Sequence, residues 1–326
     1  MKNFSDINIA VVGDIMLDKY IYGHIDNLSQ EAPVPVVQVD NKKNTLGGAG
    51  NVAKNLFNLH VNTYLYGIAG QDDHGKELRL ALELFKNYEN PIRYRLITTE
   101  KQTTTKMRII AGHQQIGRVD FEEIKDISKQ TEQNIIDDIK NSIEFDIIII
   151  SDYGKGVCTT RICKEIIKIG KEKGIITIVD PKGHDWEKYR GTDIIVPNLK
   201  ELHEPVSHSP YNLNMEDKGK YLRQHYNFES ILITRAEKGM TLINQNHIIH
   251  IPTEAQEVYD VCGAGDTVIA VLAALLAKCL PIESAIKYAN KAAGKVIQKL
   301  GTVPIEYNEM KEIMEEMTNE DQNQLC

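Results

Sequence analysis

One glycine-rich segment combines an open backbone with a carboxylate, a pairing that suits phosphoryl transfer. It is Asp260-Val-Cys-Gly-Ala-Gly-Asp-Thr267, directly before a strongly apolar stretch that predicts a helix. Its glycines let the backbone approach a ligand, and the start of a helix presents unpaired N–H groups that bind phosphate oxygens. Asp266 would repel phosphate, so we interpret its carboxylate as a base that takes a proton from an attacking hydroxyl. On spacing alone, a helix cap made of aspartate and glycine fits equally well.

A second segment, Gly48-Ala-Gly-Asn-Val-Ala53, also leads into an expected helix. It fits the dinucleotide pattern G-x-G-x-x-A, but that reading needs a strand that runs straight into the glycines. The first expected strand, at 7–12, is instead followed by Asp14 and Asp18, and the glycines come much later. We therefore favour a loop whose backbone N–H groups and Asn51 side chain bind sugar hydroxyls, with the two aspartates as further acceptors.

The rest of the chain predicts an α/β fold that brings these segments together. Short runs rich in β-branched residues predict strands at 7–12, 64–68, 146–150, 175–179, 193–196 and 230–233. Helical patterns alternate with them at 50–59, 76–86, 129–143, 160–173 and 215–225, and helices at 265–278 and 282–300 follow. This alternation predicts right-handed βαβ units and a mostly parallel sheet with helices on both faces.

Two stretches, 20–40 and 92–121, carry strand-like residues without a helical period. We expect both to lie outside the main sheet and to form a small β-lid over one end of it. The predicted organisation is a single domain over 1–310, with the lid built from about 16–42 and 92–121, and a C-terminal tail at 311–326.

Composition narrows the class of protein. The chain has 326 residues, 42% of them apolar and 26% charged, and a net charge of −8, which argues against a nucleic-acid partner or an acidic membrane surface. Its five cysteines form no Cys-x-x-Cys pair, so neither a disulfide framework nor a zinc ribbon is expected. No leader pattern opens the chain and no apolar run approaches the ~20 residues of a membrane span, so we expect a cytoplasmic protein without a membrane partner.

Several further motifs give the sequence a family resemblance. They are Val12-Gly-Asp-Ile-Met-Leu-Asp18, Ser151-Asp-Tyr-Gly-Lys-Gly156, Asp180-Pro-Lys-Gly183, Pro197-Asn-Leu-Lys-Glu201 and Thr234-Arg-Ala-Glu-Lys-Gly239. With the two glycine-rich segments, they make the chain resemble the ribokinase-like (PfkB-type) sugar kinases over about residues 7–305. Glu31-Ala-Pro-Val-Pro-Val-Val37 and Gln256-Glu-Val-Tyr259 resemble, within that family, the heptose 7-phosphate kinases.

The resemblance implies a reaction, a cofactor and an assembly. ATP would phosphorylate the anomeric hydroxyl of D-glycero-D-manno-heptose 7-phosphate to give the 1,7-bisphosphate, a step in ADP-heptose and lipopolysaccharide-core synthesis. Mg²⁺ would arrive with ATP and bind no protein atom directly, contacting Glu201 through water. The doubly wound sheet would carry a β-lid that pairs two subunits into a homodimer.

The resemblance also assigns roles to individual residues. Asp266 matches the catalytic base, and Gly263, Ala264 and Gly265 match the anion hole. The sugar-binding positions correspond to Asp18, Gly47, Gly48 and Asn51, and we place Asp14 and Asp152 with them. Asn198 and Glu201 match an element that supports the nucleotide phosphates and magnesium, and Thr234, Gly239 and Asn290 match nucleotide-contacting positions.

A phosphorylated sugar also requires cations. Lys106 and Arg108 are two residues apart on an expected strand, so their side chains share one face. Arg118 lies on the returning segment, and Lys182 follows the end of another strand. Arginine binds phosphate through paired donors and lysine acts as a point charge, so we hypothesise that Lys106, Arg108 and Lys182 form most of a clamp for the 7-phosphate. For each one, a solvated surface charge is the alternative.

The sequence departs from the family pattern in places. Cys262 stands where threonine is expected, and the segment 203–212 does not look like the usual helical continuation. No His-x-Gly-His motif is present, so we expect nucleotidyl transfer to belong to another protein or another part of the chain. Two other functions stay open: a ribokinase-like kinase for a different sugar, or a non-catalytic sugar or nucleotide sensor. The intact Asp266 and its glycines favour catalysis.

Overall fold

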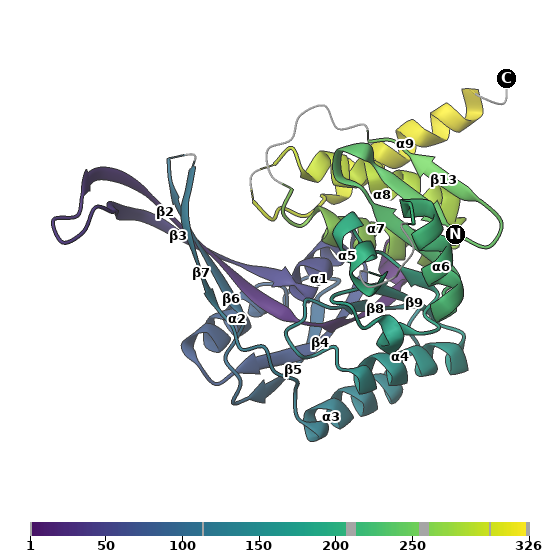
Figure 1. The fold of residues 1–326 in the computed structure, drawn as a ribbon, viewed down its shortest axis with the longest axis horizontal. Coiled ribbons are helices and arrows are strands. Elements are labelled where there is room, and N and C mark those ends of the chain that lie inside the picture. Colours follow the sequence, from purple (N-terminus) through teal and green to yellow (C-terminus); the bar gives the residue numbers. More distant parts are fainter. Residues whose placement is uncertain (1, 113, 207–212, 254–260, 300, 324–326) are drawn as a thin grey trace.

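The computed structural model describes the chain except for residues 1, 113, 207–212, 254–260, 300 and 324–326. Its centre is a nine-stranded sheet in the order β13-β12-β11-β10-β9-β8-β1-β4-β5 (Figure 1). The parallel strands are β1 (Asn8–Gly13), β4 (Asn62–Gly70), β5 (Ile92–Thr99), β8 (Ile147–Ser151), β9 (Ile176–Asp180), β10 (Ile194–Ile195) and β11 (Ser230–Thr234). An antiparallel hairpin, β12 (Met240–Ile243) and β13 (Ile248–Ile251), completes one edge.

Helices cover both faces of this sheet. One face carries α1 (Ala49–Asn58), α2 (Asp73–Glu83), α7 (Ala264–Ala277), α8 (Ile282–Val296) and α9 (Tyr307–Asn323). The other carries α3 (Lys129–Lys140), α4 (Thr160–Lys173), α5 (Leu199–His203) and α6 (Met215–Tyr226). On β8, Ile147 and Ile149 face the first core, whereas Ile148 and Ile150 face the second. A strand buried on both faces needs apolar residues at every position, which explains the uninterrupted isoleucines. The predicted α/β fold is confirmed.

A separate four-stranded sheet forms the lid. It consists of β2 (Ile15–Leu28), β3 (Pro35–Gly48), β6 (Thr105–Ala111) and β7 (Gln114–Phe121), in the order β3-β2-β6-β7. Figure 1 shows the long β2–β3 hairpin extending away from the body of the molecule. β2 begins two residues after the end of β1, so the lid starts where this parallel strand of the main sheet ends.

Two expected boundaries need correction. The stretch 92–99, predicted to belong to the lid, is β5, which pairs in parallel with β4 at the edge of the main sheet. The helix α2 joins the two strands, as a parallel crossover requires. Within the tail predicted at 311–326, residues 311–323 belong to α9, and Ile313 and Met317 are buried in the core, so this part is not separate from the domain. No helix in the described part of the chain is long and apolar enough to cross a membrane.

Candidate active site

The predicted base lies in the first turn of α7. The chain enters this helix through Gly263, whose φ of +82° is left-handed. Asp266 is only 5% exposed, and both of its carboxylate oxygens accept a hydrogen bond. Asn51 Nδ2 donates to Oδ2 at 2.7 Å, and the hydroxyl of Tyr153 donates to Oδ1 at 2.6 Å. Two segments that are distant in sequence therefore meet at one carboxylate.

Burial sets the protonation behaviour of this carboxylate. Desolvation raises the pKa of Asp266 to about 6, and the nearby charge of Asp18 acts in the same direction. The hydrogen bonds from Asn51 and Tyr153 oppose that rise because they stabilise the charged form. A carboxylate with a pKa close to neutrality is ionised at pH 7 and still basic enough to accept a proton from a hydroxyl.

The α1 segment supplies an unpaired acceptor beside the base. Asn51 is 2% exposed, and its Oδ1 has no hydrogen-bond partner among the described residues. A buried carbonyl oxygen without a partner costs free energy unless a ligand satisfies it. A hydroxyl group of a bound sugar is a donor of the right kind, which supports the predicted role of Asn51 in substrate binding.

The glycines allow close approach on both sides of the site. A Cβ at Gly47 would lie 2.3 Å from Asp18 Oδ2, and a Cβ at Gly263 would lie 2.8 Å from Asn51 Nδ2. At Gly265, by contrast, no atom of the described residues lies within 4 Å of the Cβ position. The start of α7 is therefore open on this side, as a phosphate-binding helix N-terminus requires.

The lid brings predicted cations onto one face. Arg108 donates to Asp18 Oδ1 at 2.6 Å, and its guanidinium lies 5.3 Å from the centre of the Tyr20 ring. Lys106 lies opposite Asp18 on the neighbouring strand, and Arg118 lies opposite Arg108. The side chains of Lys106 and Arg118 therefore project from the same face of the lid sheet as that of Arg108. Arg118 is half-exposed and pairs with Asp120 at 2.9 Å, so it lies at the rim of this cationic face.

Lys182 does not join these lid cations in its contacts. Its amino group instead pairs with Glu201 at 2.9 Å. Glu201 also accepts from the backbone N–H of Asn198, and Asn198 Oδ1 accepts from the N–H of Glu201, both at 3.0 Å. This capping box starts α5, so both side chains have a structural function besides the predicted contact with nucleotide. Lys182 therefore contacts a predicted nucleotide residue and not the lid cations with which the sequence grouped it.

The remaining nucleotide positions cluster near the end of β11. Thr234 forms a bridge with Asn198. Gly239 has a φ of +75°, and a Cβ there would lie 2.0 Å from Ile251 O, so the turn requires glycine. Asn290 donates to Pro252 O at 2.8 Å. The segment 256–259, which carries part of the heptose-kinase resemblance, lies outside the described residues, as do Asp260 and much of 203–212.

Several carboxylates crowd the same edge of the sheet. Burial raises the pKa of Asp180 well above its usual range, and the charges of Asp266, Glu201 and Asp152 add to that rise, while Lys182 opposes it. Such a concentration of negative charge favours a cation nearby. The donor set of Asp180 and Glu201 consists of hard oxygen ligands, which fits Mg²⁺ carried by a nucleotide.

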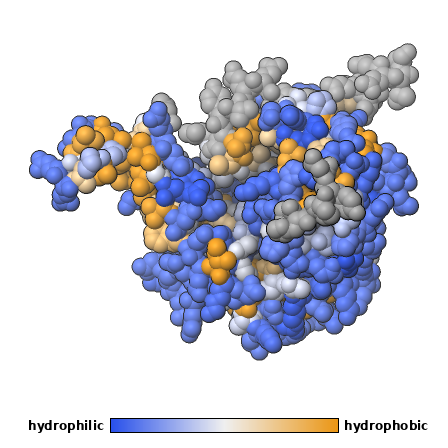
Figure 2. Space-filling model, viewed as in Figure 1, coloured by the Kyte–Doolittle hydropathy of each residue, from blue (hydrophilic) through white to orange (hydrophobic). Residues whose placement is uncertain are grey.

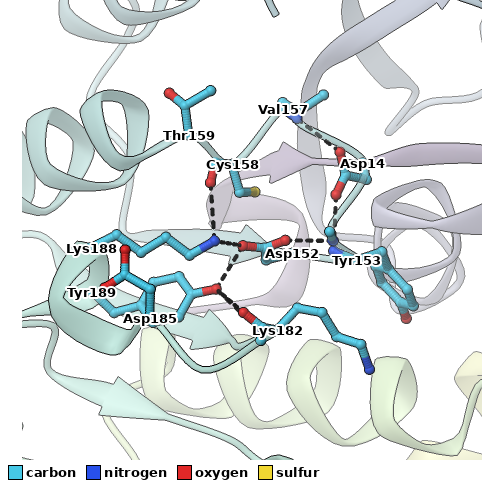
Figure 3. A network of polar contacts seen from close by, with 12 residues as sticks. Asp14, Asp152, Tyr153, Val157, Cys158, Thr159, Lys182, Asp185, Lys188 and Tyr189 are labelled. Carbon is cyan, nitrogen blue, oxygen red and sulfur yellow. Dashed lines mark hydrogen bonds and ion pairs between the residues drawn. The ribbon is translucent and has the colours of Figure 1, made fainter. Parts of the chain in front are cut away.

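Two predicted sugar ligands have other contacts. Asp14 accepts three backbone N–H groups, from Tyr153, Lys155 and Val157, at 2.9, 2.9 and 3.0 Å. Asp152 accepts from Gly154 N, from the Tyr189 hydroxyl and from Lys188 (Figure 3). Both carboxylates therefore hold the loop after β8 rather than presenting free oxygens to a ligand. Both residues lie at strand ends, as predicted, but the sequence alone does not show that their carboxylate oxygens accept hydrogen bonds from the loop.

Sequence reasoning missed two residues of the site. Tyr153 lies in a quoted motif, but only the fold shows its contact with Asp266. Lys54 is three residues after Asn51 on α1 and so shares its helix face, a signal that could have identified it. Its amino group donates to Thr45 Oγ1 at 3.0 Å and to Thr302 O at 2.9 Å. Burial first, and the charge of Lys43 second, lower the pKa of Lys54 to about 8, while Asp18 and Asp266 oppose that shift.

Comparisons with known proteins show the family to which the chain belongs. The pfkB family of carbohydrate kinases matches residues 6–307. The chain is 40% identical over 310 residues to the "Bifunctional protein HldE" of Actinobacillus pleuropneumoniae serotype 5b, covering 94% of this chain and 64% of that protein. It is also 40% identical over 305 residues to the protein of the same name from Proteus mirabilis, covering 93% and 62%. The chain therefore spans slightly less than two thirds of the length of these relatives.

Solved structures share the fold at low sequence identity. Phosphofructokinase-2 from Escherichia coli in complex with potassium superposes with a TM-score of 0.78 at 16% identity, over 96% of this chain and 99% of that one. A ribokinase from Arabidopsis thaliana complexed with ribose and ATP gives 0.68 at 19% identity, over 94% and 98%.

Proposed function

This chain belongs to the pfkB family of carbohydrate kinases, and we propose that it phosphorylates the anomeric hydroxyl of D-glycero-D-manno-heptose 7-phosphate with ATP. The product is the 1,7-bisphosphate. The resemblance of the sequence to heptose 7-phosphate kinases supports this choice of sugar, as does the 40% identity to the bifunctional proteins HldE. The observation that carries the proposal is the buried carboxylate of Asp266 at the start of α7, next to the unpaired Oδ1 of Asn51.

The proposed reaction assigns each group one task. Asp266 takes the proton of the anomeric hydroxyl as that oxygen forms a bond to the γ-phosphorus, and the bond to the β,γ-bridging oxygen breaks to release ADP. The backbone N–H groups at Gly263, Ala264 and Gly265 stabilise the charge that develops on the transferring phosphoryl oxygens. Magnesium bound to ATP would neutralise phosphate charge, and Glu201 would contact it through water, with the carboxylate of Asp180 nearby.

We assign the sugar 7-phosphate to the cationic face of the lid. Arg108 is the central residue because it is mostly buried and oriented by Asp18 and the Tyr20 ring. Lys106 lies beside it, and Arg118 is at the rim. Gly47, Gly48 and Asp18 would contact hydroxyls of the sugar, while Asn198, Thr234, Gly239 and Asn290 would contact the nucleotide. The lid would also pair two chains into a homodimer.

The first test replaces the proposed base. Asp266→Asn keeps the size and one acceptor of the side chain but removes its basicity, so kcat should fall by about 10²–10⁴-fold while ATP still binds. ATP affinity is measured separately by calorimetry. Retained turnover would remove Asp266 from its assigned role. Retained fold and loss of both turnover and ATP binding would point instead to a structural role.

The second test identifies the substrate. Purified protein is incubated with heptose 7-phosphate, ATP and magnesium, and the product is examined by ³¹P NMR for a new phosphate on the anomeric carbon. A panel of other sugars and sugar phosphates, followed through ADP release, is the comparison. If ribose, fructose or another sugar phosphate reacts faster, the alternative of a different ribokinase-like kinase is correct. If no sugar releases ADP, the alternative of a sensor gains support.

A further inference from the structure

We infer that Tyr153 is a positioning residue for the base: its hydroxyl fixes the carboxylate of Asp266 and keeps it ionised at the pH of the reaction. This inference rests on the proposed role of Asp266. Tyr153 does not need to touch the sugar or ATP for this function, since it acts through the carboxylate.

The contact with Asp266 is direct and specific. The Tyr153 hydroxyl lies 2.6 Å from Oδ1, the oxygen that does not accept from Asn51. Each carboxylate oxygen can accept two hydrogen bonds, so both keep capacity for a substrate hydroxyl. With one donor on each oxygen, the plane of the carboxylate is fixed, and the remaining acceptor positions are held in place. A base must be oriented in this way because proton transfer requires hydrogen-bond geometry.

The loop that carries Tyr153 is held from two sides. Asp14, at the end of β1, accepts the backbone N–H groups of residues 153, 155 and 157. Asp152 is anchored by the Tyr189 hydroxyl at 2.6 Å and by Lys188, which also donates to Cys158 O. Figure 3 shows Asp14 and Asp152 on either side of the turn, with the Tyr153 ring directed away from the Lys188 side of the network.

Glycine fixes the path of the same loop. Gly156 has a φ of +92°, and a Cβ there would lie 2.0 Å from Lys125 O, so no other residue fits without displacement of the backbone. Two buried carboxylates and this glycine therefore constrain a short stretch of chain. A tyrosine on such a constrained loop stays at the base when substrate binds, which argues against a side chain that swings away to admit the sugar.

The chemistry of the phenol suits a permanent donor. Burial, followed by the charge of Asp266, raises the pKa of Tyr153 well above its usual range, so the hydroxyl keeps its proton. It therefore donates to Asp266 and stabilises the ionised carboxylate. This opposes desolvation, which on its own would leave more of the base protonated and inactive at neutral pH.

The test is the pH dependence of kcat/KM for Tyr153→Phe at saturating magnesium and ATP. The variant loses one hydroxyl and no ring packing. A hydrogen bond to a charged group is worth about one to two pKa units. The acid limb of the profile, where kcat/KM rises as the base loses its proton, should therefore move to higher pH by about one to two units. Activity should fall roughly tenfold at pH 6 and recover to within about threefold of the wild type near pH 9.

A second buried tyrosine provides the matched control. Tyr66 is 6% exposed, and its hydroxyl contacts Ser142, outside the site. Tyr66→Phe should leave the acid limb where it is in the wild type. A Tyr153→Phe enzyme whose acid limb does not move would overturn the inference. A rate that is lower at every pH would indicate a merely structural role, and a higher rate would indicate an inhibitory contact.

Failure of this inference and failure of the proposed function give different results. If Asp266→Asn retains turnover, the assigned base is wrong, whatever Tyr153 does. If Asp266→Asn is inactive and the acid limb of Tyr153→Phe does not move, the base stands and the role of Tyr153 is wrong.

Discussion

Asp266 illustrates how a functional position can oppose folding. An aspartate with an ordinary pKa near 3.9 in the unfolded chain binds its proton more tightly in the folded protein, where burial raises the pKa to about 6. Between these two values the folded state retains protons that the unfolded state has lost. Stability therefore falls as pH rises through this window, and the loss persists at higher pH.

Replacing Asp266 should consequently stabilise the protein. Asp266→Asn removes the titration, so the free energy of unfolding at pH 7.5 should rise by roughly 1–3 kcal/mol, and the gain should shrink as pH approaches 4. Urea unfolding at pH 4.5 and 7.5 measures the effect. Asp73→Asn is the control, because Asp73 is exposed on α2 and its pKa is lowered by Lys76; it should give no stabilisation. A pH-independent change in Asp266→Asn would contradict the argument.

Arg108 offers a second test at this scale. Arg108→Ala removes a guanidinium that is 13% exposed and oriented by Asp18, so the KM for heptose 7-phosphate should rise by about 10–100-fold while the KM for ATP changes little. The loss should largely disappear with unphosphorylated heptose. Arg95→Ala, which breaks an exposed pair with Asp138, is the matched control. An unchanged KM for the sugar phosphate would remove Arg108 from the clamp.

Functional residues are predictable from the sequence where their type and local spacing indicate their role. Asp266 and Asn51 were identified because glycines flank each of them before a helix, and the structure joins them by a hydrogen bond. The role of Tyr153 is not predictable in this way, because its partner is 113 positions away and no local pattern specifies that contact. The contacts of Asp14 and Asp152 were equally hidden, since a strand-end carboxylate can serve a ligand or a loop.

The elements were predictable where hydrophobic pattern and length agree. The isoleucine run of β8 reads as a strand buried on both faces, and the apolar stretch of α7 reads as a buried helix. The sequence does not reveal the sheet to which β5 belongs, because its alternating exposure is the same at the edge of the main sheet and in the lid. Pairing partners are long-range information, which alternation does not contain.

The loop after β8 gives a prediction at the scale of elements. Asp14→Asn replaces an acceptor of three backbone N–H groups with a side chain that must point an amide donor toward one of them. Unfolding free energy should fall by about 2–4 kcal/mol, and kcat should fall as well, because Tyr153 is no longer held against the base. Urea unfolding and steady-state kinetics measure the two effects. A stable variant with normal kcat would show that the clamp is dispensable.

The lid projects from the body of the molecule, and its projecting part exposes apolar side chains. Figure 2 shows hydrophobic residues along the extended β2–β3 region, outside the compact core. Exposed aliphatic residues of these strands and their connection are Ile25, Leu28, Val34, Val36 and Val39, with exposed fractions of 38 to 65%. A hairpin that projects into solvent with this composition favours association, since apolar patches on monomers are usually small.

The proposed homodimer follows from burial of this patch against a second lid. Val36→Asp combined with Val39→Asp places charges on side chains that are 45% and 46% exposed, so it should shift the protein from dimer to monomer with little effect on folding. Light scattering coupled to size exclusion measures the mass at several concentrations. Leu84→Asp, at a 72% exposed position after α2, controls for the added charge and should leave the mass unchanged. Because β2 carries Asp18 as well as Ile25 and Leu28 of this patch, separation of the lids should also raise the KM for the sugar phosphate. A wild-type protein that is monomeric at all concentrations, or a double variant that remains dimeric, would rule out assembly through the lid.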